Sequence, residues 1–301
     1  MQYKLSILGC GNMCGSILQG ALNKHLFKPQ EIVIKNSSFT RSQTVANHFQ
    51  VHATDTITDI ETAELVMLGI KPQMLNDIAL HVSNSSTVIS VLAGITTKTL
   101  SQKLNTPNVV RVMPNMAAKV NQGLSGVFFS PTIDSHTQQQ IIAVLETSGE
   151  VIILPQEDYM NRFMVLSGSL IGILGFWEHN FAYYNQENVQ AELIKILHHL
   201  SSEKFFQAPD GQKIINQTFT GYQAMREKTG ITAQEMQQRV SSKGGVTEAM
   251  TNFLNTEAAQ SVQQKFFKHP TKNSQSMTDI IRKMFTVGEE KSEMLSFHCE
   301  N

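Results

Sequence analysis

Short apolar runs alternate with longer amphipathic stretches over the first half of the chain. Most runs are bounded by Gly, Pro or Asn, as buried strands are. The expected strands are Leu5–Leu8, Ile32–Ile34, Leu65–Leu68, Val88–Leu92, Val109–Met113 and Val151–Leu154. Stretches such as Gly15–Lys24 and Ser42–Phe49 are long enough for crossover helices, and Asp134 is placed to cap a helix that runs to Leu145. This alternation predicts a Rossmann-like α/β domain over residues 1–156, with a parallel sheet covered on both faces.

The second half has a helical pattern without strand runs. Breaks fall at turn residues such as Pro209-Asp-Gly, Lys243-Gly-Gly and His269-Pro270. Asp158 is expected to cap the first helix. The expected helices are Asn161–Tyr184, Glu187–Phe206, Gly211–Lys228, Thr232–Val240, Thr247–Gln264 and Met277–Leu295. Residues 157–301 are therefore predicted to form an all-helical domain for dimerisation and substrate binding.

Composition and charge narrow the class of protein. The 24 basic and 25 acidic side chains give a net charge of −1, which argues against nucleic acid or an anionic membrane as a partner. The longest apolar stretch, Val165–Trp177, is shorter than the roughly 20 residues of a membrane span. The first residues lack the pattern of a secretory signal, and the cysteines Cys10, Cys14 and Cys299 do not suggest a disulfide scaffold. We expect a cytoplasmic protein that binds a small molecule.

A glycine-rich loop follows the first predicted strand and opens the first helix. In Gly9-Cys-Gly11-Asn-Met-Cys14, Gly9 permits a tight turn and Gly11 lets a pyrophosphate approach the backbone. Cys14, at the third glycine position, is small enough for close packing of helix and strand. Because no His or acid lies nearby, the cysteines are interpreted as small residues in a crowded loop, and no metal site is expected. The alternative to dinucleotide binding is a merely tight turn.

The end of the second strand bears on the choice of nucleotide. A site for NAD usually places an acidic residue there, but this chain has Lys35-Asn-Ser-Ser38, followed by Arg41, and no acid before Asp55. Neutral donors and cations suit the 2′-phosphate of NADP. We therefore expect NADP(H), with NAD(H) as the alternative cofactor; a solvated Asn-Ser turn is the other interpretation of this segment.

Three further motifs identify a family. Gly69-Ile-Lys-Pro72, Ser90-Val-Leu-Ala-Gly94 and Arg111-Val-Met-Pro-Asn115 each end a predicted strand, where ligands bind in open α/β sheets. Together with the glycine loop, they resemble pyrroline-5-carboxylate reductase, which makes proline with NAD(P)H. The resemblance implies a Rossmann domain and a helical domain that dimerises or assembles further. It is dense over the first 125 residues and patchier afterwards.

The resemblance also implies which residues bind the cofactor. One group lines the pyrophosphate, a second meets the adenosine ribose or its phosphate, and the rest lie along the dinucleotide; Thr56 stands where the family often has Asn. The residues are Leu8, Gly9, Cys10, Gly11, Asn12 and Met13, then Asn36, Ser37, Ser38 and Thr56, and finally Gly69, Ile70, Lys71, Pro72, Val91, Leu92 and Ala93.

The substrate motifs depart from the family's pattern. Its Ser-Gly-Ser-Gly-Pro-Ala-Tyr turn appears as Ser167-Gly-Ser169 followed by Leu170-Ile171, and its Ser-Pro-Gly-Gly-x-Thr loop as Ser242-Lys-Gly-Gly-Val-Thr247. Leu and Ile fill room that Gly and Pro would leave. Lys243 either meets an anionic substrate or is a solvated loop charge. Met116-Ala117 replaces Thr-Pro after the Met-Pro-Asn motif.

The implied substrate is a cyclic imine that carries a carboxylate. The amides of Gly244, Gly245 and Val246 are expected to hold the carboxylate, as an anion-binding nest before a helix does. The Thr247 hydroxyl is expected to meet the ring nitrogen, while Ser169 and Asn115 shape the wall. Thr247 and Ser169 are thus the candidate catalytic residues. The predicted reaction is the NADPH-dependent reduction of 1-pyrroline-5-carboxylate to L-proline. Alternatives are reduction of another cyclic imine and a non-catalytic NADP-binding role.

Overall fold

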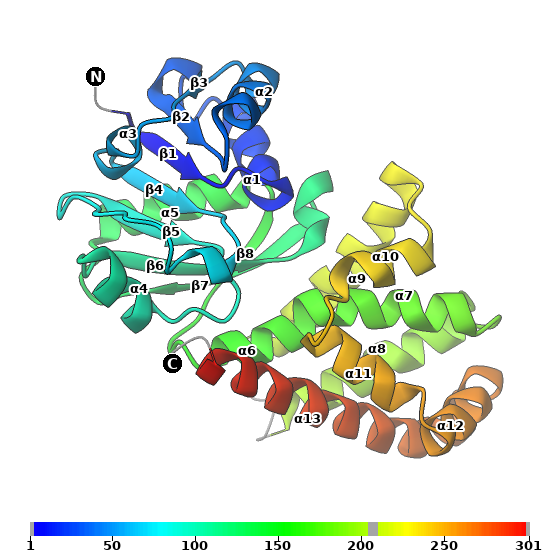
Figure 1. The fold of residues 1–301 in the computed structure, drawn as a ribbon. Coiled ribbons are helices and arrows are strands. Elements are labelled where there is room, and N and C mark those ends of the chain that lie inside the picture. The colour runs from blue at the N-terminus through cyan, green and yellow to red at the C-terminus, as the bar shows by residue number, and fades with distance from the viewer. Residues whose placement is uncertain (1–2, 204–209, 299–301) are drawn as a thin grey trace. The chain divides into compact units, whose positions relative to one another are not determined.

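The computed structural model describes residues 3–203 and 210–298, and its first half is built on one twisted sheet (Figure 1). The described strands are β1 (Leu5–Leu8), β2 (Ile32–Lys35), β3 (His52–Ala53), β4 (Leu65–Leu68), β5 (Thr87–Ser90), β6 (Val109–Pro114), β7 (Gly123–Phe129) and β8 (Gly149–Ile153). Their order across the sheet is β3-β2-β1-β4-β5-β6-β7-β8. All six expected strands are present. The sequence did not indicate β3, which has two residues, or β7.

The strands from β3 to β6 are parallel, and β7 pairs with β6 in the antiparallel direction. The expectation of a purely parallel sheet is therefore wrong at this edge. The connection from β6 to β7 contains only the short 3₁₀ turn η3 (Met116–Val120), whereas a parallel crossover requires a dozen or more residues. The two strands can consequently only run in opposite directions.

Helices cover both faces of the sheet, as predicted. They are α1 (Asn12–Asn23), α2 (Phe39–Phe49), α3 (Thr58–Glu61), α4 (Thr97–Leu104) and α5 (Ser135–Glu146), with short 3₁₀ turns η1 (Pro29–Glu31) and η2 (Pro72–Met74). On one face, Ile17 of α1 and Leu145 of α5 pack in a core with Ile7 of β1. On the other, Leu100 of α4 packs with Val66 and Val88. The predicted cap is confirmed, because the Asp134 carboxylate accepts the amides of His136 and Thr137.

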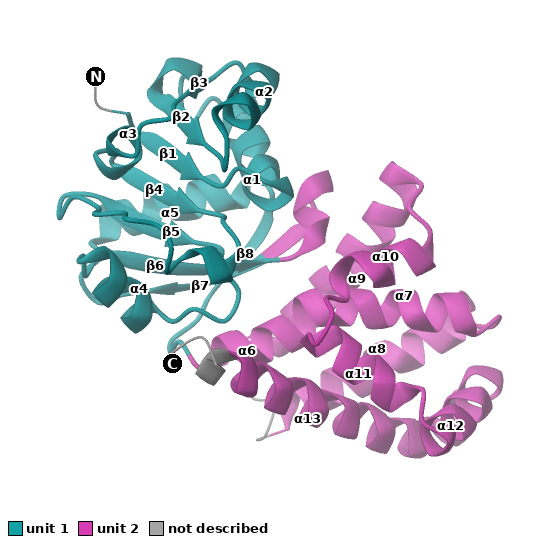
Figure 2. Ribbon diagram, in the orientation of Figure 1, with its two compact units in different colours: residues 1–114, 125–157, 296–301 teal, residues 115–124, 158–295 magenta. Residues whose placement is uncertain are grey.

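The chain divides into two compact units (Figure 2). Unit 1 consists of residues 1–114, 125–157 and 296–301, and unit 2 of residues 115–124 and 158–295. The chain thus leaves the sheet after β6, contributes the loop 115–124 to unit 2 and returns as β7. The predicted domain boundary near residue 156 did not include this excursion and stays a prediction.

Unit 2 is helical, as expected. Its described elements are α6 (Tyr159–Met164), the π-helical segment η4 (Val165–Ser169), α7 (Leu170–Asn180), α8 (Glu187–Ser202), α9 (Gly211–Thr229), α10 (Ala233–Val240), α11 (Val246–Leu254), α12 (Glu257–Lys268), the turn η6 (Thr271–Asn273) and α13 (Ser274–His298).

Two helix predictions are wrong, and part of a third lies outside the described residues. Asp158 does not cap α6, because it is itself in the helical conformation and its side chain accepts no cap hydrogen bond. The expected helix Thr247–Gln264 is two helices, which separate at Asn255 and Thr256. Helix α8 ends at Ser202, so the predicted extension to Phe206 falls outside the described residues.

The stretch from α6 to α7 forms the core of unit 2. By length and composition, Tyr159–Asn180 could cross a membrane, and it is the one such helix within the described residues. However, 78% of its apolar window is buried inside the protein, which is how the core helix of a folded domain behaves. Gly175 lets α10 approach, because a Cβ there would lie 2.6 Å from the Ala233 carbonyl oxygen. Trp177 donates its indole N–H to the buried Gln263 at 3.0 Å.

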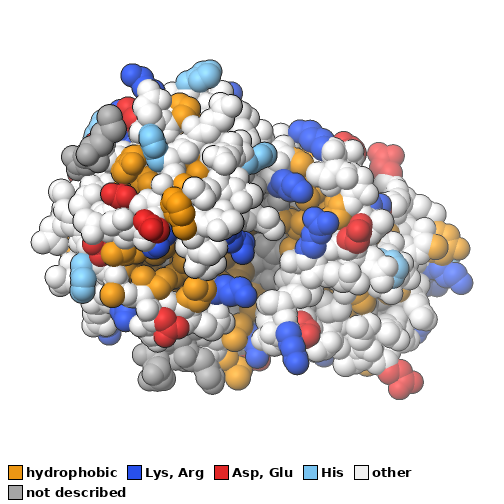
Figure 3. Space-filling view, turned by 45° about the horizontal axis from the view of Figure 1, so that its top comes forward, with side chains coloured by type: hydrophobic (Ala, Val, Ile, Leu, Met, Phe, Trp, Pro, Cys, Tyr) orange, Lys and Arg blue, Asp and Glu red, His pale blue; other side chains and the backbone are white. Residues whose placement is uncertain are grey.

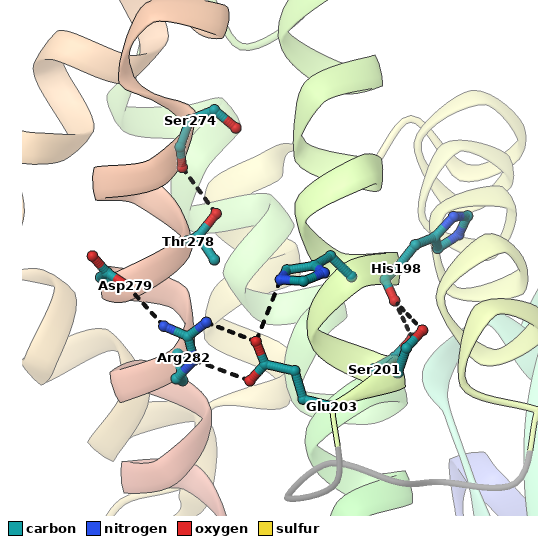
Figure 4. Close-up of polar contacts among 9 residues, drawn as sticks. His198, Ser201, Glu203, Ser274, Thr278, Asp279 and Arg282 are labelled. Atoms are coloured by element: carbon teal, nitrogen blue, oxygen red, sulfur yellow. Dashed lines mark hydrogen bonds and ion pairs between the residues drawn. The ribbon is translucent and has the colours of Figure 1, made fainter.

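An ion-pair cluster joins the end of α8 to α13 (Figure 4). The two carboxylate oxygens of Glu203 accept from Nη2 and Nε of Arg282, at 2.7 and 3.0 Å. Arg282 also donates to Asp279 at 2.8 Å, and His199 lies 3.4 Å from Glu203. The bidentate geometry is the strong form of an arginine–carboxylate pair.

Candidate functional site

The predicted cofactor segments leave the sheet at one common edge. The parallel register places Leu8 beside both Lys35 and Leu68, and Leu68 beside Ser90. Residues 9–13, 36–38, 69–72 and 91–93 therefore all begin at the carboxyl ends of neighbouring strands. The strand order changes direction at β1, which lies between β2 and β4. Ligands of open α/β sheets bind at such a switch point.

Two glycines form the tightest contact at this edge. Gly9 has φ +88°, and a Cβ there would lie 2.6 Å from the Ile70 nitrogen. A Cβ on Gly69 would lie 2.2 Å from the sulfur of Cys14 and 2.6 Å from the Gly9 carbonyl oxygen. The loops after β1 and β4 thus fit together only because both residues lack a side chain. Cys14 packs against Gly69, as its expected role in helix–strand packing requires.

Gly11 has a different role. It is the N-cap of α1 and is exposed, and no atom lies within 4 Å of a Cβ built on it. Nothing in the protein's own packing of unit 1 therefore requires glycine at this position. Asn12 and Met13 follow in the first turn, where helix geometry leaves backbone N–H groups without intrahelical acceptors. Open space before a helix start suits a phosphate.

The loop cysteines are neutral packing residues. Burial raises the pKa of the Cys10 thiol to about 12 and raises the pKa of Cys14 further. A thiol in this state stays protonated at neutral pH and is a poor nucleophile. Leu8 is also buried, so it faces the core and would meet a ligand only through its backbone. The described residues contain no group of three or more His, Cys, Asp or Glu side chains that could hold a metal ion.

Asn36 lies at the end of β2 with an unused donor. Its backbone N–H donates to the Ser42 hydroxyl at 2.8 Å, whereas its side-chain Nδ2 is buried without a hydrogen-bond partner. Ser37 is exposed, and Ser38 caps α2 by accepting the Arg41 amide at 3.3 Å. Lys35 is less free than the sequence suggested, because its Nζ donates to the Asp55 carbonyl at 2.7 Å. The side-chain donors on this segment are thus Asn36, Ser37, Ser38, whose O–H is not used by the cap, and the exposed Arg41.

The remaining cofactor candidates lie on short loops. Thr56 is exposed, and its N–H donates to the Thr54 hydroxyl. Lys71 is exposed, while Ile70 and Pro72 are half-buried. After β5, the Val91 N–H still donates to Leu68, the Leu92 side chain is buried and Ala93 is exposed.

Asn115 closes the loop that joins β6 to β7. Its Oδ1 accepts the amides of Ala117 and Leu124, each at 3.2 Å. Its Nδ2 is buried and has no hydrogen-bond partner. Oδ1 thus already accepts two backbone amides of the protein, and only the Nδ2 donor of Asn115 is left for a ligand.

The two candidate catalytic residues come together in unit 2. The Thr247 hydroxyl donates to the Ser169 hydroxyl at 3.2 Å, and both residues are buried. Thr247 lies in the first turn of α11, and Ser169 ends the π-helical segment η4. The Ser167–Ser169 segment, expected to form a turn, is thus part of a continuous helix with a π-bulge, a distortion frequent at functional sites. Leu170 and Ile171 are fully buried in the first turn of α7. No atom lies within 4 Å of a Cβ on Gly168, so the bulge has open space beside it.

The glycine loop before α11 already has acceptors for its amides. The Gly245 N–H donates to the Ser242 carbonyl at 2.9 Å, and the Gly244 N–H donates to the Glu248 carboxylate at 2.7 Å. Of the amides predicted to hold a substrate carboxylate, only that of Val246 remains in the first turn of the helix, where no intrahelical acceptor exists. Lys243 is exposed.

Sequence reasoning gave no role to two acidic residues, one in each unit. Glu157 accepts from buried Arg111 at 3.0 Å and from both the amide and hydroxyl of Thr97, which ties the start of α4 to strand β6. Glu248 is the third residue of its helix, and the capping-box pattern could have indicated that such a residue reaches back toward the helix start. Elsewhere on the face drawn in Figure 3, basic and acidic side chains are both present and interspersed.

Two family models match separate parts of the chain. Residues 4–94 match the model described as NADP oxidoreductase coenzyme F420-dependent, and residues 191–277 match the model for pyrroline-5-carboxylate reductase dimerisation. The pyrroline-5-carboxylate reductase of Staphylococcus epidermidis is 26% identical over 82% of this chain and 87% of its own length. That of Staphylococcus aureus is 27% identical over the same shares.

Solved structures show the same fold. The pyrroline-5-carboxylate reductase of Coxiella burnetii aligns with a TM-score of 0.53 at 22% identity, over 93% of this chain and 99% of that one. The enzyme of Streptococcus pyogenes gives 0.51 at 21% identity, over 91% and 98%. The chain thus resembles the pyrroline-5-carboxylate reductases in both of its parts. The predicted Rossmann-like domain, helical dimerisation domain and oxidoreductase class are confirmed.

Proposed function

We propose that this chain reduces 1-pyrroline-5-carboxylate to L-proline with NADPH. Curated relatives that match 82% of this chain are named pyrroline-5-carboxylate reductase. The structural observation that supports it best is the buried hydrogen bond from Thr247 to Ser169, at the end of a π-bulge and the start of a helix. This pair lies at the positions that the resemblance assigned to the reacting nitrogen and to the pocket wall.

The edge of the sheet in unit 1 fits a dinucleotide. The open space at Gly11 would take the pyrophosphate, and the unpartnered Nδ2 of Asn36 would donate to the adenosine ribose or its phosphate. Residues 69–72 and 91–93 would line the rest of the cofactor. Bound NADPH supplies a hydride equivalent. No carboxylate follows Asn36 in Ser37, Ser38 or the first turn of α2, so nothing acidic there would repel a 2′-phosphate. A solved relative from Plasmodium falciparum has NADP bound, with a TM-score of 0.50 at 17% identity.

The residues of unit 2 would orient the imine. Because the Thr247 proton is directed to Ser169, the lone pairs of the Thr247 oxygen are left to accept from the N–H of a protonated imine. A protonated imine that gains a hydride becomes a neutral secondary amine, so this step needs no further proton from the protein. The Val246 amide and the amide donor of Asn115 would meet the substrate carboxylate. The task of these residues is positioning rather than acid–base catalysis.

The proposed function also bears on the oligomeric state and the cellular location of the protein. The match to a dimerisation model suggests a homodimer or larger assembly through unit 2. Light scattering should then give at least twice the 33.6 kDa of one chain. A purely monomeric chain at micromolar concentration would contradict this. We propose a cytoplasmic location, which cell fractionation tests.

One assay tests the proposed activity. The full-length protein is mixed with NADPH and 1-pyrroline-5-carboxylate; the absorbance of NADPH should fall and L-proline should appear in equal amount. The same assay with other cyclic imines tests the alternative substrate. If NADPH binds but no imine supports its oxidation, the reductase proposal is wrong and a non-catalytic NADP-binding role replaces it.

A further inference from the structure

Glu248 occupies part of the loop that was expected to bind the substrate carboxylate. Its Oε2 accepts the backbone N–H of Gly244 at 2.7 Å. Gly244 has φ +71°, and no atom lies within 4 Å of a Cβ built on it, so the loop is open on that side. The protein therefore already holds one carboxylate on an amide of this loop.

The neighbouring Gly245 amide cannot replace the Gly244 amide as a donor to a ligand. A Cβ on Gly245 would lie 2.3 Å from the Ser242 hydroxyl oxygen, and the Gly245 N–H donates to Ser242. The turn from Ser242 to Gly245 is therefore closely packed, and the Gly245 amide is already used within it. An incoming anion has the first-turn amides of Val246 and Thr247, directly beside the Glu248 carboxylate.

Electrostatics make this arrangement unfavourable for a second anion. Two carboxylates a few ångströms apart repel each other by several times the thermal energy near a protein surface. The partial positive charge of the helix start, which would otherwise attract the substrate carboxylate, is already offset by Glu248. The positive side chain in the loop, Lys243, is exposed and therefore screened by solvent.

We propose that Glu248 is a specificity-determining residue that competes with the carboxylate of the substrate for the Gly244–Thr247 loop. It selectively weakens the binding of cyclic imines that carry a carboxylate, relative to the same ring without one. This inference rests on the proposed placement of the substrate beside Thr247. It assigns to Glu248 control of substrate choice rather than a part in the chemical step.

Binding of a simple anion tests the inference without turnover. Titration calorimetry on the full-length protein uses cyclopentanecarboxylate as the probe and cyclopentanecarboxamide, which has the same shape without the charge, as the uncharged control. Glu248→Gln keeps an acceptor for Gly244 and removes the charge, so it should bind cyclopentanecarboxylate about three- to thirtyfold more tightly. Glu248→Ala, which frees the amide, should bind at least as tightly. Neither variant should bind cyclopentanecarboxamide more tightly.

The matched control is Glu257→Gln. Glu257 is an exposed glutamate in the first turn of α12, in the same unit, so this variant makes the same charge change at another helix start. Its affinity for cyclopentanecarboxylate should equal that of the wild type. An equal gain in this variant would mean that net charge alone acts, and would overturn the inference.

Kinetics separate this inference from the proposed function. Glu248→Gln should lower KM for 1-pyrroline-5-carboxylate by the same factor, with kcat within about twofold and KM for 1-pyrroline unchanged. If no variant turns over an imine but the probe binds more tightly to Glu248→Gln, the proposed function fails and the role of Glu248 stands. If turnover occurs but neither KM nor probe affinity improves, the role of Glu248 fails. Absence of probe binding to every variant also overturns it.

Discussion

The hydroxyl of Thr247 donates to the hydroxyl of Ser169 at 3.2 Å, across the contact between α11 and the π-helical segment η4. Helix α11 also packs closely on α7, the continuation of η4, because Gly172 of α7 lacks a side chain: a Cβ there would lie 2.7 Å from Cγ2 of Thr247. The hydrogen bond thus fixes the rotamer of Thr247. A hydroxyl held in this way presents its lone pairs in one direction, as a substrate-orienting group must.

Replacing Thr247 with Val should reduce turnover more than it reduces stability. The change keeps the shape and removes one hydroxyl, so kcat/KM should fall roughly ten- to a hundredfold if that hydroxyl meets the reacting nitrogen. The loss of the bond to Ser169 should cost about 1 kcal/mol of unfolding free energy. Steady-state kinetics and chemical denaturation measure the two effects.

Thr251→Val is the control for this variant. Thr251 lies one turn further along α11, is also buried and donates its hydroxyl to the Thr247 carbonyl. Its stability loss should be similar, but its turnover should stay within about twofold of the wild type. Equal losses of turnover in both variants would show that Thr247 acts only through the helix.

Replacement by Ala should affect the reaction rate at Ser169 but not at Ser167. Ser169→Ala removes the acceptor of Thr247 and should lower kcat/KM by roughly threefold to thirtyfold by freeing that hydroxyl to rotate. The Ser167 hydroxyl is buried without a hydrogen-bond partner, so Ser167→Ala should be neutral or should stabilise the fold by up to about 1 kcal/mol. Melting temperatures and kinetics of both variants test this. A strong rate loss in Ser167→Ala would place that hydroxyl in the site as well.

Gly9 and Gly11 should differ although they belong to one motif. Gly9→Ala should destabilise unit 1 by about 2 kcal/mol or more, because φ is +88° and the new Cβ would meet the Ile70 nitrogen at 2.6 Å. Gly11→Ala should change stability by less than about 1 kcal/mol, since its φ of −95° suits any residue and the space is open. Its NADPH affinity should nevertheless fall at least about tenfold if the pyrophosphate lies there. Unchanged affinity would argue against that placement.

These two glycines show what sequence could predict of the site. The motif located the loop and its place before a helix, since strand, turn and helix are specified by local residues. It could not separate a glycine needed by the fold from one needed by a ligand, because the neighbour of Gly9 is Ile70, far away in the sequence. Six strands were predicted from continuous apolar runs, which β3 and β7 lack. Strand β3 has two residues, and Ser125 and Gly126 interrupt the apolar residues of β7.

The helical unit was harder to predict in detail. The helix Asn161–Tyr184 was expected, but its π-bulge was not, because the bulged segment packs against α9 and α11, and such contacts leave no trace in the local periodicity. Asp158 has a side chain suited to capping, yet its backbone is already helical, so that side chain accepts no cap hydrogen bond. Nearby, the amides of the Gly244 loop were expected to be free. Glu248, which accepts the Gly244 amide, follows the loop in the sequence. That its side chain turns back onto the loop was not inferred.

Cofactor preference should depend on Asn36. The wild type should bind NADPH more tightly than NADH, and Asn36→Asp should reverse or reduce this preference about tenfold or more by repelling the 2′-phosphate. Asn47→Asp, an exposed change in the last turn of α2, is the control and should leave the ratio unchanged. Calorimetric titration with both cofactors gives the ratio. Equal affinities in the wild type would contradict the prediction.

Stability at low pH should depend on the cluster of Glu203 and Arg282 (Figure 4). The hydrogen bonds from Arg282 hold the pKa of the Glu203 carboxyl below its usual range. A carboxyl whose pKa is lower in the folded state stabilises the fold above its unfolded pKa of about 4.3, and this contribution is lost as the pH falls through the folded value. The wild type should therefore be more stable than Glu203→Gln near pH 7, and the difference should shrink as the pH falls below about 4. Glu187→Gln, an exposed change in the first turn of α8, is the matched control for removing one negative charge from the same unit. Chemical denaturation at several pH values measures these differences, and a Glu203→Gln difference that stays constant down to pH 2 would mean that the ion pair does not contribute.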